Sequence, residues 1–152
     1  RRSRRAPNPL TLAHNAAISE LYVVLRMQSG QAGLRLVSFR REGDAREEFT
    51  TPDGKRHAIA PDATVVLGDA EERRLYAHVE IDLGTMSHTR LRTKLGQYLL
   101  YTERQAWRDA RFEFQPALLF ATTGTRRAGR FGRAAGSLAR SKRWAGATSL
   151  RL

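Results

Sequence analysis

The chain has 152 residues, of which 41% are hydrophobic and 28% are charged, and it contains no cysteine. This length suits one domain with a single core, and the apolar content excludes a disordered chain. The lack of cysteine excludes disulfides, thiolate zinc sites and cysteine nucleophiles. No apolar run approaches the roughly 20 residues of a membrane span. We therefore expect a soluble, cytoplasmic protein without membrane contacts.

The formal net charge of +12 is concentrated at the two ends of the chain. Residues 1–5 contain four arginines, residues 123–152 contain eight Lys or Arg and no acid, and residues 6–122 carry 15 basic against 15 acidic residues. Such basic ends favour DNA as partner, with phosphate contacts from Arg126, Arg127, Arg130, Arg133, Arg140, Lys142 and Arg143. The alternatives are an arginine-rich surface without a partner and an acidic membrane surface.

Helical and strand patterns alternate along the chain. The first helix is predicted from Leu10 to about Gln28, a segment without glycine or proline. The later patterns predict strands at 34–39 and 47–51, a turn at 52–55, a hairpin of strands 63–67 and 75–83, a helix from the N-cap Ser87 to about Asp109, a strand at 116–121, a helix at 127–140 and a strand at 147–152. This order predicts an α/β domain over residues 10–152 with a central mixed sheet flanked by helices, preceded by a basic arm at 1–9.

Two apolar stripes make the first helix apolar almost all round. One consists of His14, Ile18, Leu21 and Leu25, and the other of Ala13, Ala16, Ala17, Glu20, Val23, Val24 and Met27. An ionised glutamate on a buried stripe must be paired, neutralised or bound to a metal. We therefore predict that Glu20 belongs to a functional site.

The predicted hairpin brings acidic residues together. A register that pairs Leu67 with Arg74 places Asp62 opposite Val79 and makes Glu80 its neighbour. Cross-strand neighbours have Cβ atoms about 5 Å apart, and diagonal neighbours about 7 to 8 Å. The carboxylates of Asp62 and Glu80 are therefore close enough to share a ligand.

Asp82 projects from the same face of the strand as Glu80. Carboxylates that converge without a basic partner repel one another unless a proton or a hard cation lies between them. We predict that Asp62, Glu80 and Asp82 hold Mg²⁺ or Mn²⁺. Alternatively, Asp62 only caps the strand and the alternating polar residues only face solvent.

The second long helix carries a polar and aromatic face. Lys94, Gln97, Tyr98 and Tyr101 follow one another at i, i+3, i+4 and i+7. Taken alone, the two tyrosines would be core residues and Lys94 would extend beside them to solvent. Beside the acidic residues, this face becomes a second part of the predicted site.

These motifs resemble the PD-(D/E)XK nuclease superfamily. The resemblance rests on Pro61-Asp62, on Glu80-Ile81-Asp82, and on a helix with Lys94 and Gln97-x-x-x-Tyr101, preceded by the helical Glu20. It implies a restriction-endonuclease-like αβββαβ core in which the aspartate and glutamate bind Mg²⁺ and a lysine assists the attacking water. Asp82 occupies the position of the usual lysine, which the resemblance allows Lys94 to replace from the following helix.

A narrower resemblance is to the replication-relaxation family of actinobacterial plasmid and integrative-element proteins, over about residues 10 to 150. It rests on His14-Asn15, on Pro61-Asp62-Ala63, and on Val79 to Thr85 leading to Lys94-x-x-x-Tyr98. It implies an upstream winged-helix module, and it leaves a homodimer open.

Two functions follow from these observations. The first is an Mg²⁺-dependent DNA-nicking or DNA-cleaving domain in plasmid replication, relaxation or mobilisation. Its catalytic residues would be Glu20, Asp62, Glu80, Asp82, Lys94, Gln97 and Tyr101. The alternative is a catalytically inactive relative that binds DNA as a replication accessory protein. An RNA-directed or purely structural protein is a third hypothesis.

Overall fold

The computed structural model describes the backbone of residues 8–142 and 147–151 and the side chains of residues 8–137. In chain order the elements are α1 (Pro9–Gln28), the short 3-10 helix η1 (Ser29–Ala32), β1 (Arg35–Arg41), η2 (Glu42–Ala45), β2 (Glu47–Thr50), β3 (Arg56–Ile59), β4 (Ala63–Gly68), β5 (Arg74–Asp82), α2 (His88–Glu103), β6 (Ala117–Thr122), α3 (Thr125–Lys142) and β7 (Ala147–Arg151). The mixed α/β architecture predicted from the sequence is confirmed. The predicted basic arm at 1–9 lies almost entirely outside the described residues.

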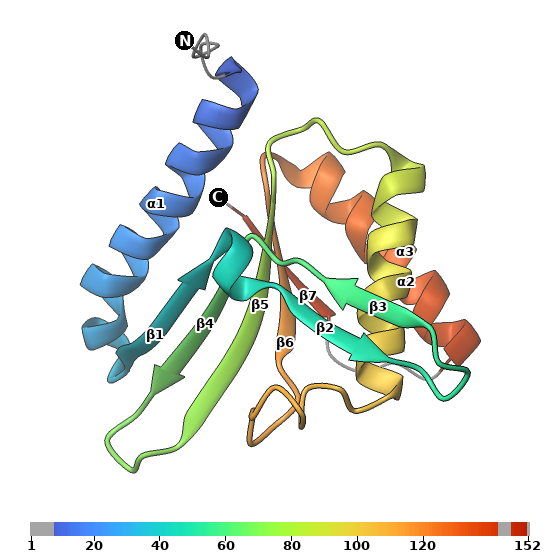
Figure 1. Ribbon diagram of the computed structural model, residues 1–152. Coiled ribbons are helices and arrows are strands. Elements are labelled where there is room, and N and C mark those ends of the chain that lie inside the picture. Colours follow the sequence, from blue (N-terminus) through green and yellow to red (C-terminus); the bar gives the residue numbers. More distant parts are fainter. Residues whose placement is uncertain (1–7, 143–146, 152) are drawn as a thin grey trace, which may run out of the picture.

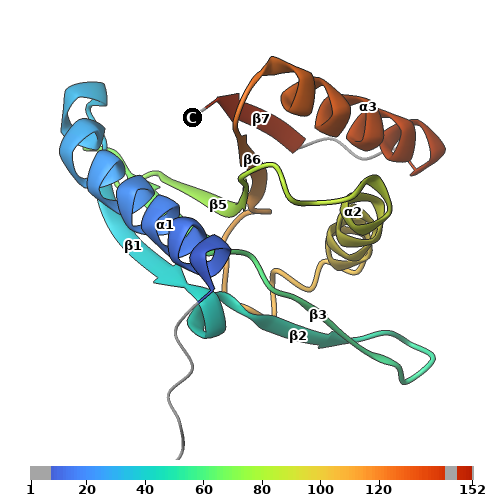
Figure 2. The ribbon, with the colours of Figure 1, turned by 90° about the horizontal axis from the view of Figure 1, so that it is seen from above.

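The strands form a mixed sheet in the order β1-β4-β5-β6-β7. β4 pairs antiparallel with β1 and β5, whereas β6 pairs parallel with β5 and β7. Helix α1 covers one face of this sheet, and α2 and α3 cover the other (Figures 1 and 2). β2 and β3 form a separate antiparallel hairpin that extends beside α2.

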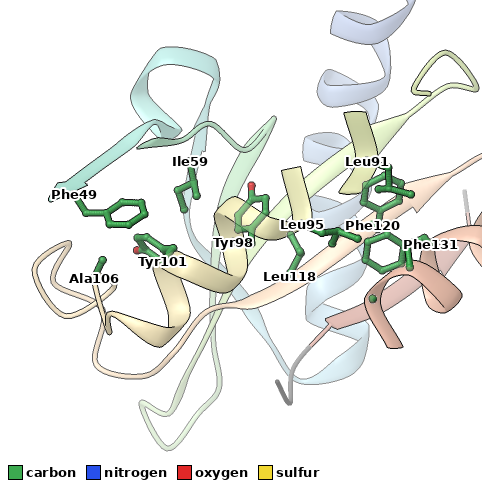
Figure 3. Packing of buried hydrophobic residues seen from close by; sticks show 12 residues of the cluster. Phe49, Ile59, Leu91, Leu95, Tyr98, Tyr101, Ala106, Leu118, Phe120 and Phe131 are labelled. Atoms are coloured by element: carbon green, nitrogen blue, oxygen red, sulfur yellow. The ribbon is translucent and has the colours of Figure 1, made fainter. Parts of the chain in front are cut away.

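Two apolar clusters hold these layers together. On the α1 side, Ile18 packs with Val65, Val79 and Ile81 of the sheet. On the other side, the cluster joins the β2–β3 hairpin to α2, β6 and α3 through Phe49, Ile59, Leu91, Leu95, Tyr98, Tyr101, Leu118, Phe120 and Phe131 (Figure 3). The hairpin is therefore anchored to the domain by its inward-facing side chains.

Two segments differ from the prediction. Strand β3 follows the predicted turn at 52–55, although no strand was expected there. Arg56 and His57 lack the apolar alternation of a typical strand. The second long helix ends at Glu103, and turns replace the predicted continuation to Asp109. Positive φ angles of 53° at Gln105 and 63° at Arg111 show that the chain leaves helical geometry there.

The central hairpin forms with a register one residue away from the predicted one. Leu67 pairs with Leu75 instead of Arg74. The turn is tightened by Asp69, whose side chain accepts hydrogen bonds from two backbone N–H groups of the turn. Ala63 therefore pairs with Val79 in place of the predicted Asp62, although the amide of Asp62 still donates to the Val79 carbonyl at 3.0 Å.

The predicted buried stripe that included Glu20 is wrong. Helix α1 turns His14, Ile18, Leu21 and Leu25 toward the sheet, whereas Glu20 is exposed on the opposite side. Both stripes have helical spacing, and spacing alone does not identify the face that packs. Glu20 lies away from the other acidic residues of the predicted site and is excluded from it.

We predict that the two faces of α1 differ sharply in their contribution to stability. Ile18→Ala should cost about 2–5 kcal/mol because it leaves a cavity under the helix. Met27→Ala should cost less than about 0.5 kcal/mol, since Met27 is 72% exposed whereas Ile18 is 1% exposed. Urea unfolding of both variants measures the difference, and equal losses would show that the outer face is also covered.

Candidate functional site

A cleft of about 880 Å³ opens between the β2–β3 hairpin, α2 and the end of β5. Its lining comprises His14, Arg46, Glu48, Arg56, His57, Ala58, Ala60, Asp62, Ile81, Asp82, Thr85, Met86, Arg90, Thr93, Lys94 and Gln97. Most of the side chains that line the cleft are polar or charged. Asp62, Asp82, Lys94 and Gln97 were predicted as site residues, and the structure brings all four to one cleft.

Glu80 lies directly behind the cleft wall and is 1% exposed. Lys94 donates a charge-assisted hydrogen bond to one carboxylate oxygen, and the Tyr98 hydroxyl donates to the other at 2.5 Å. Lys94 and Tyr98 are one helical turn apart on α2, so they reach the same carboxylate from one helix face. The predicted proximity of Glu80 and Lys94 is therefore present in the structure.

The environment of Glu80 changes its protonation. Burial raises the pKa of Glu80 to about 7, the neighbouring charge of Lys94 opposes this rise, and the charge of Asp62 adds to it. Burial and the charge of Glu80 also raise the pKa of Tyr98 well above 10, which keeps the phenol a hydrogen-bond donor. A nearby cation therefore determines whether Glu80 is ionised at neutral pH.

Asp62 is one of three acidic residues that line the cleft, together with Glu48 and Asp82. One carboxylate oxygen accepts a hydrogen bond of 2.7 Å from the Ile81 amide, and the other lies 3.1 Å from His14 Nε2. The Asp62 side chain is 19% exposed. Three elements, α1, β5 and the segment before β4, thus fix its orientation, and part of the carboxylate stays accessible from the cleft.

Asp82 was predicted as a metal ligand, but both of its carboxylate oxygens accept hydrogen bonds from other residues of the protein. One of its oxygens accepts hydrogen bonds from the amides of Gly84, Thr85 and Met86 at 3.0–3.1 Å. The other accepts from Arg127 at 2.6 Å. Asp82 therefore fixes the loop after β5 and ties it to α3, which corrects its expected role beside the metal.

Gln97 and Tyr101 share a face of α2 but lie in different surroundings. Gln97 is exposed in the cleft. Tyr101 is buried, and its hydroxyl donates to Glu47 of the hairpin. Tyr101 therefore fastens the hairpin to α2 instead of entering the predicted catalytic group.

The basic residues of the cleft were missed by the sequence analysis. Arg46 and Arg56 line it from the hairpin and Arg90 lines it from α2. Arg90 precedes Lys94 by four residues, a spacing that places both on one helix face and that could have revealed it. The hairpin arginines gave no comparable signal, because their position depends on how the hairpin folds over the sheet.

Helix α3 separates the predicted phosphate-binding residues into two groups. Arg126, Arg130 and Arg133 are exposed at i, i+4 and i+7, so one surface of the helix is cationic. Arg127 is instead bound to Asp82 and is withdrawn from that surface. The side chains of Arg140, Lys142 and Arg143 lie outside the described residues.

A buried histidine lies on the same strand as Glu80. His78 is 2% exposed, its Nδ1 lies 3.2 Å from Thr64 Oγ1, and its Nε2 has no hydrogen-bond partner among the described residues. Burial, assisted by the charge of Arg40, lowers the pKa of His78 to about 3. The folded protein therefore holds this imidazole in its neutral form.

Comparison with known proteins shows the family of the chain. The model of the replication-relaxation family matches residues 1–115, which is 115 of the 152 residues. The chain belongs to the replication-relaxation family, and this membership indicates a role in plasmid replication or relaxation. The match includes Asp62, Glu80 and Lys94 and ends before β6, earlier than the predicted resemblance. No curated protein and no solved structure matches the chain.

The helices in the described part of the chain include none that is both long and apolar enough to cross a membrane.

We predict that the Asp82–Arg127 pair is structural. Arg127→Ala should lower the free energy of unfolding by about 2–3 kcal/mol, because it leaves a buried carboxylate without its cation. Arg126→Ala, one position earlier and exposed, should change it by less than about 0.5 kcal/mol. Chemical denaturation compares the two variants, and an equal effect would contradict the structural role of Arg127.

We also predict an altered pH dependence for His78→Leu. As pH falls from 6.5 to about 4.5, unfolded protein takes up a proton at His78 and folded protein takes one up at Glu80, so the two effects on stability oppose each other. Without His78, the uptake by folded protein prevails, and stability should rise by up to about 1.4 kcal/mol per pH unit on acidification. Thermal unfolding between pH 7 and 5 tests this sign; parallel profiles would contradict it.

Proposed function

We propose that the protein is a divalent-metal-dependent nuclease that nicks or cleaves DNA during plasmid replication, relaxation or mobilisation. The observation that carries the proposal is that Asp62 and Lys94 line one cleft, while Lys94 binds Glu80 directly behind its wall and the charge of Asp62 acts on the same carboxylate. These are the residues expected from the PD-(D/E)XK resemblance, with the lysine supplied by α2. Family membership supports the biological setting.

The order of elements supports the same assignment. Without the β2–β3 hairpin, the chain runs α1-β1-β4-β5-α2-β6, which is the αβββαβ order expected of a restriction-endonuclease-like core. Asp62 precedes the second strand of that core, and Glu80 lies near the end of the third. The hairpin is then an insertion between the first and second strands.

The donor set fits Mg²⁺ or Mn²⁺. Asp62 has a part-exposed carboxylate, and Glu80 would add a second one once Lys94 leaves it. Carboxylate oxygen is the ligand type that Mg²⁺ prefers, and Mg²⁺ is commonly held by only one or two carboxylates together with water and phosphate. No group of three or more acidic or histidine side chains suited to a metal occurs among the described residues. Substrate phosphate and water would therefore complete the coordination, and neither Glu20 nor Asp82 would contribute.

Other residues of the chain orient the two carboxylates and would stabilise charge on the substrate. Tyr98 orients the Glu80 carboxylate through its hydrogen bond, and the Ile81 amide and His14 orient Asp62. Lys94, 25% exposed at the cleft, would stabilise negative charge on the scissile phosphate once released from Glu80. A bound Mg²⁺ would polarise that phosphate and lower the pKa of a coordinated water.

The alternative is a catalytically inactive DNA-binding accessory protein. It is favoured by one observation: Lys94 already neutralises Glu80, so the buried carboxylate has a cation without any metal. In that case the cleft would bind DNA, and the Glu80–Lys94 pair would serve only the fold.

We predict opposite effects of two variants on metal binding. In wild-type protein, Mn²⁺ at a hundredfold excess over its Kd should stabilise the fold by about 2.7 kcal/mol. Glu80→Gln should abolish this stabilisation and the nicking of supercoiled plasmid. Lys94→Met should increase the metal-induced thermal shift, because the competing ammonium is gone, yet it should also abolish nicking.

Glu20→Gln is the matched control, because Glu20 is an exposed acidic residue that does not line the cleft. Its thermal shift and nicking rate should equal those of wild-type protein. A wild-type protein that neither shifts with Mn²⁺ nor nicks plasmid would replace the nuclease with the inactive DNA-binding protein.

A further inference from the structure

We propose that the cleft binds a single unpaired DNA strand through its phosphates, with the β2–β3 hairpin on one side of the strand and α2 on the other. This inference rests on the proposed function and specifies the form of its substrate. It arises from the cationic residues of the hairpin and α2, which the catalytic group does not use.

The hairpin directs most of one face toward the cleft. Arg46, Glu48, Arg56, Ala58 and Ala60 all line the cleft, and Glu48 pairs directly with Ala58 across the two strands. Side chains alternate along a strand, so these residues share the face opposite to the one that packs in the core. The hairpin is thus a wall with an apolar inner face and a charged face toward the cleft.

Cations are present on both sides of the cleft. Arg56 on the hairpin and Arg90 on α2 have no acidic partner among the described residues, whereas Arg46 is paired with Glu48 at 3.0 Å. The acidic Asp82 in the lining is neutralised by Arg127. Two free guanidinium groups thus flank Asp62 and Lys94, an arrangement that suits successive phosphates of a backbone.

The dimensions favour one strand over a duplex. A volume of about 880 Å³ lies within the range of pockets for small ligands. Asp62 and Lys94 are only 19% and 25% exposed, so they lie below the exposed arginines of the rim. A phosphate that reaches Asp62 must enter between the hairpin and α2, and a single backbone requires less room there than a duplex.

The lining also determines how the strand is recognised. The cleft lining contains no Phe, Tyr or Trp. Of its two histidines, His14 lies against Asp62, and His57 stacks on Phe49 with ring centroids 5.5 Å apart. Stacking of bases on aromatic side chains is therefore not offered, unlike in many single-strand binding proteins. Contacts to phosphates alone make binding tolerant of sequence and sensitive to salt.

The test measures fluorescence anisotropy of a labelled mixed-sequence single-stranded oligonucleotide and of the corresponding duplex, in EDTA so that no cleavage occurs. Wild-type protein should bind the single strand more tightly. The double variant Arg56→Ala, Arg90→Ala should weaken that binding about tenfold and reduce the log–log salt slope by about 1.4, which corresponds to two lost phosphate contacts. Its affinity for duplex should change less than twofold.

The matched control is Arg92→Ala, Arg104→Ala, which removes two exposed arginines of the same helix region that do not line the cleft. It should leave single-strand affinity within twofold of wild type. An equal loss in the control, or equal weakening of duplex and single strand by the cleft variant, would overturn the proposal. All four substituted arginines are exposed, and circular dichroism verifies that both variants fold.

The outcomes for strand binding and for catalysis are separable. Single-strand binding through Arg56 and Arg90 without any metal-dependent nicking would refute the nuclease and retain this inference. Metal-dependent nicking together with single-strand binding that does not depend on Arg56 and Arg90 would refute this inference and retain the nuclease.

Discussion

The buried carboxylate of Glu80 is the constraint on which the rest of the structure depends. An acidic side chain at 1% exposure needs partners for both oxygens, and Lys94 and Tyr98 supply them from one face of α2. This pairing fixes the rotation of α2 about its axis. The same rotation buries Leu95 in the core and turns Gln97 toward the cleft. One interaction thus sets both the packing of the helix and the composition of the site.

Stability alone gives little reason for such an arrangement. A buried ion pair often contributes no more than a well-packed apolar pair of similar volume, because both charges lose their hydration. The neighbouring Asp62 adds a further unfavourable charge and raises the pKa of Glu80. Asp62 and Glu80 nevertheless act on each other electrostatically beside the cleft, and a cation bound by both would relieve this repulsion, as the proposed function requires.

Local sequence patterns predicted most of the helices and strands and part of the site. They did not predict contacts between residues that are distant in the sequence. Strict alternation on β5 identified Glu80, and helical spacing placed Lys94 and Tyr98 together. The same spacing misplaced Glu20, because α1 carries apolar residues on both faces and only the tertiary contact distinguishes them. The partner of Asp82 lies 45 residues away on α3. No local pattern could reveal such a pairing, nor the arginines that the hairpin brings to the cleft.

The replacement of lysine by Asp82 has an architectural consequence. Its carboxylate gathers three amides of the loop after β5 and binds Arg127, and Arg127 also donates to the Met86 carbonyl. Asp82 therefore connects the wall of the cleft to the first turn of α3. The same helix carries the exposed residues Arg126, Arg130 and Arg133. The Asp82–Arg127 pair thus links the wall of the cleft to the helix that carries the cationic surface.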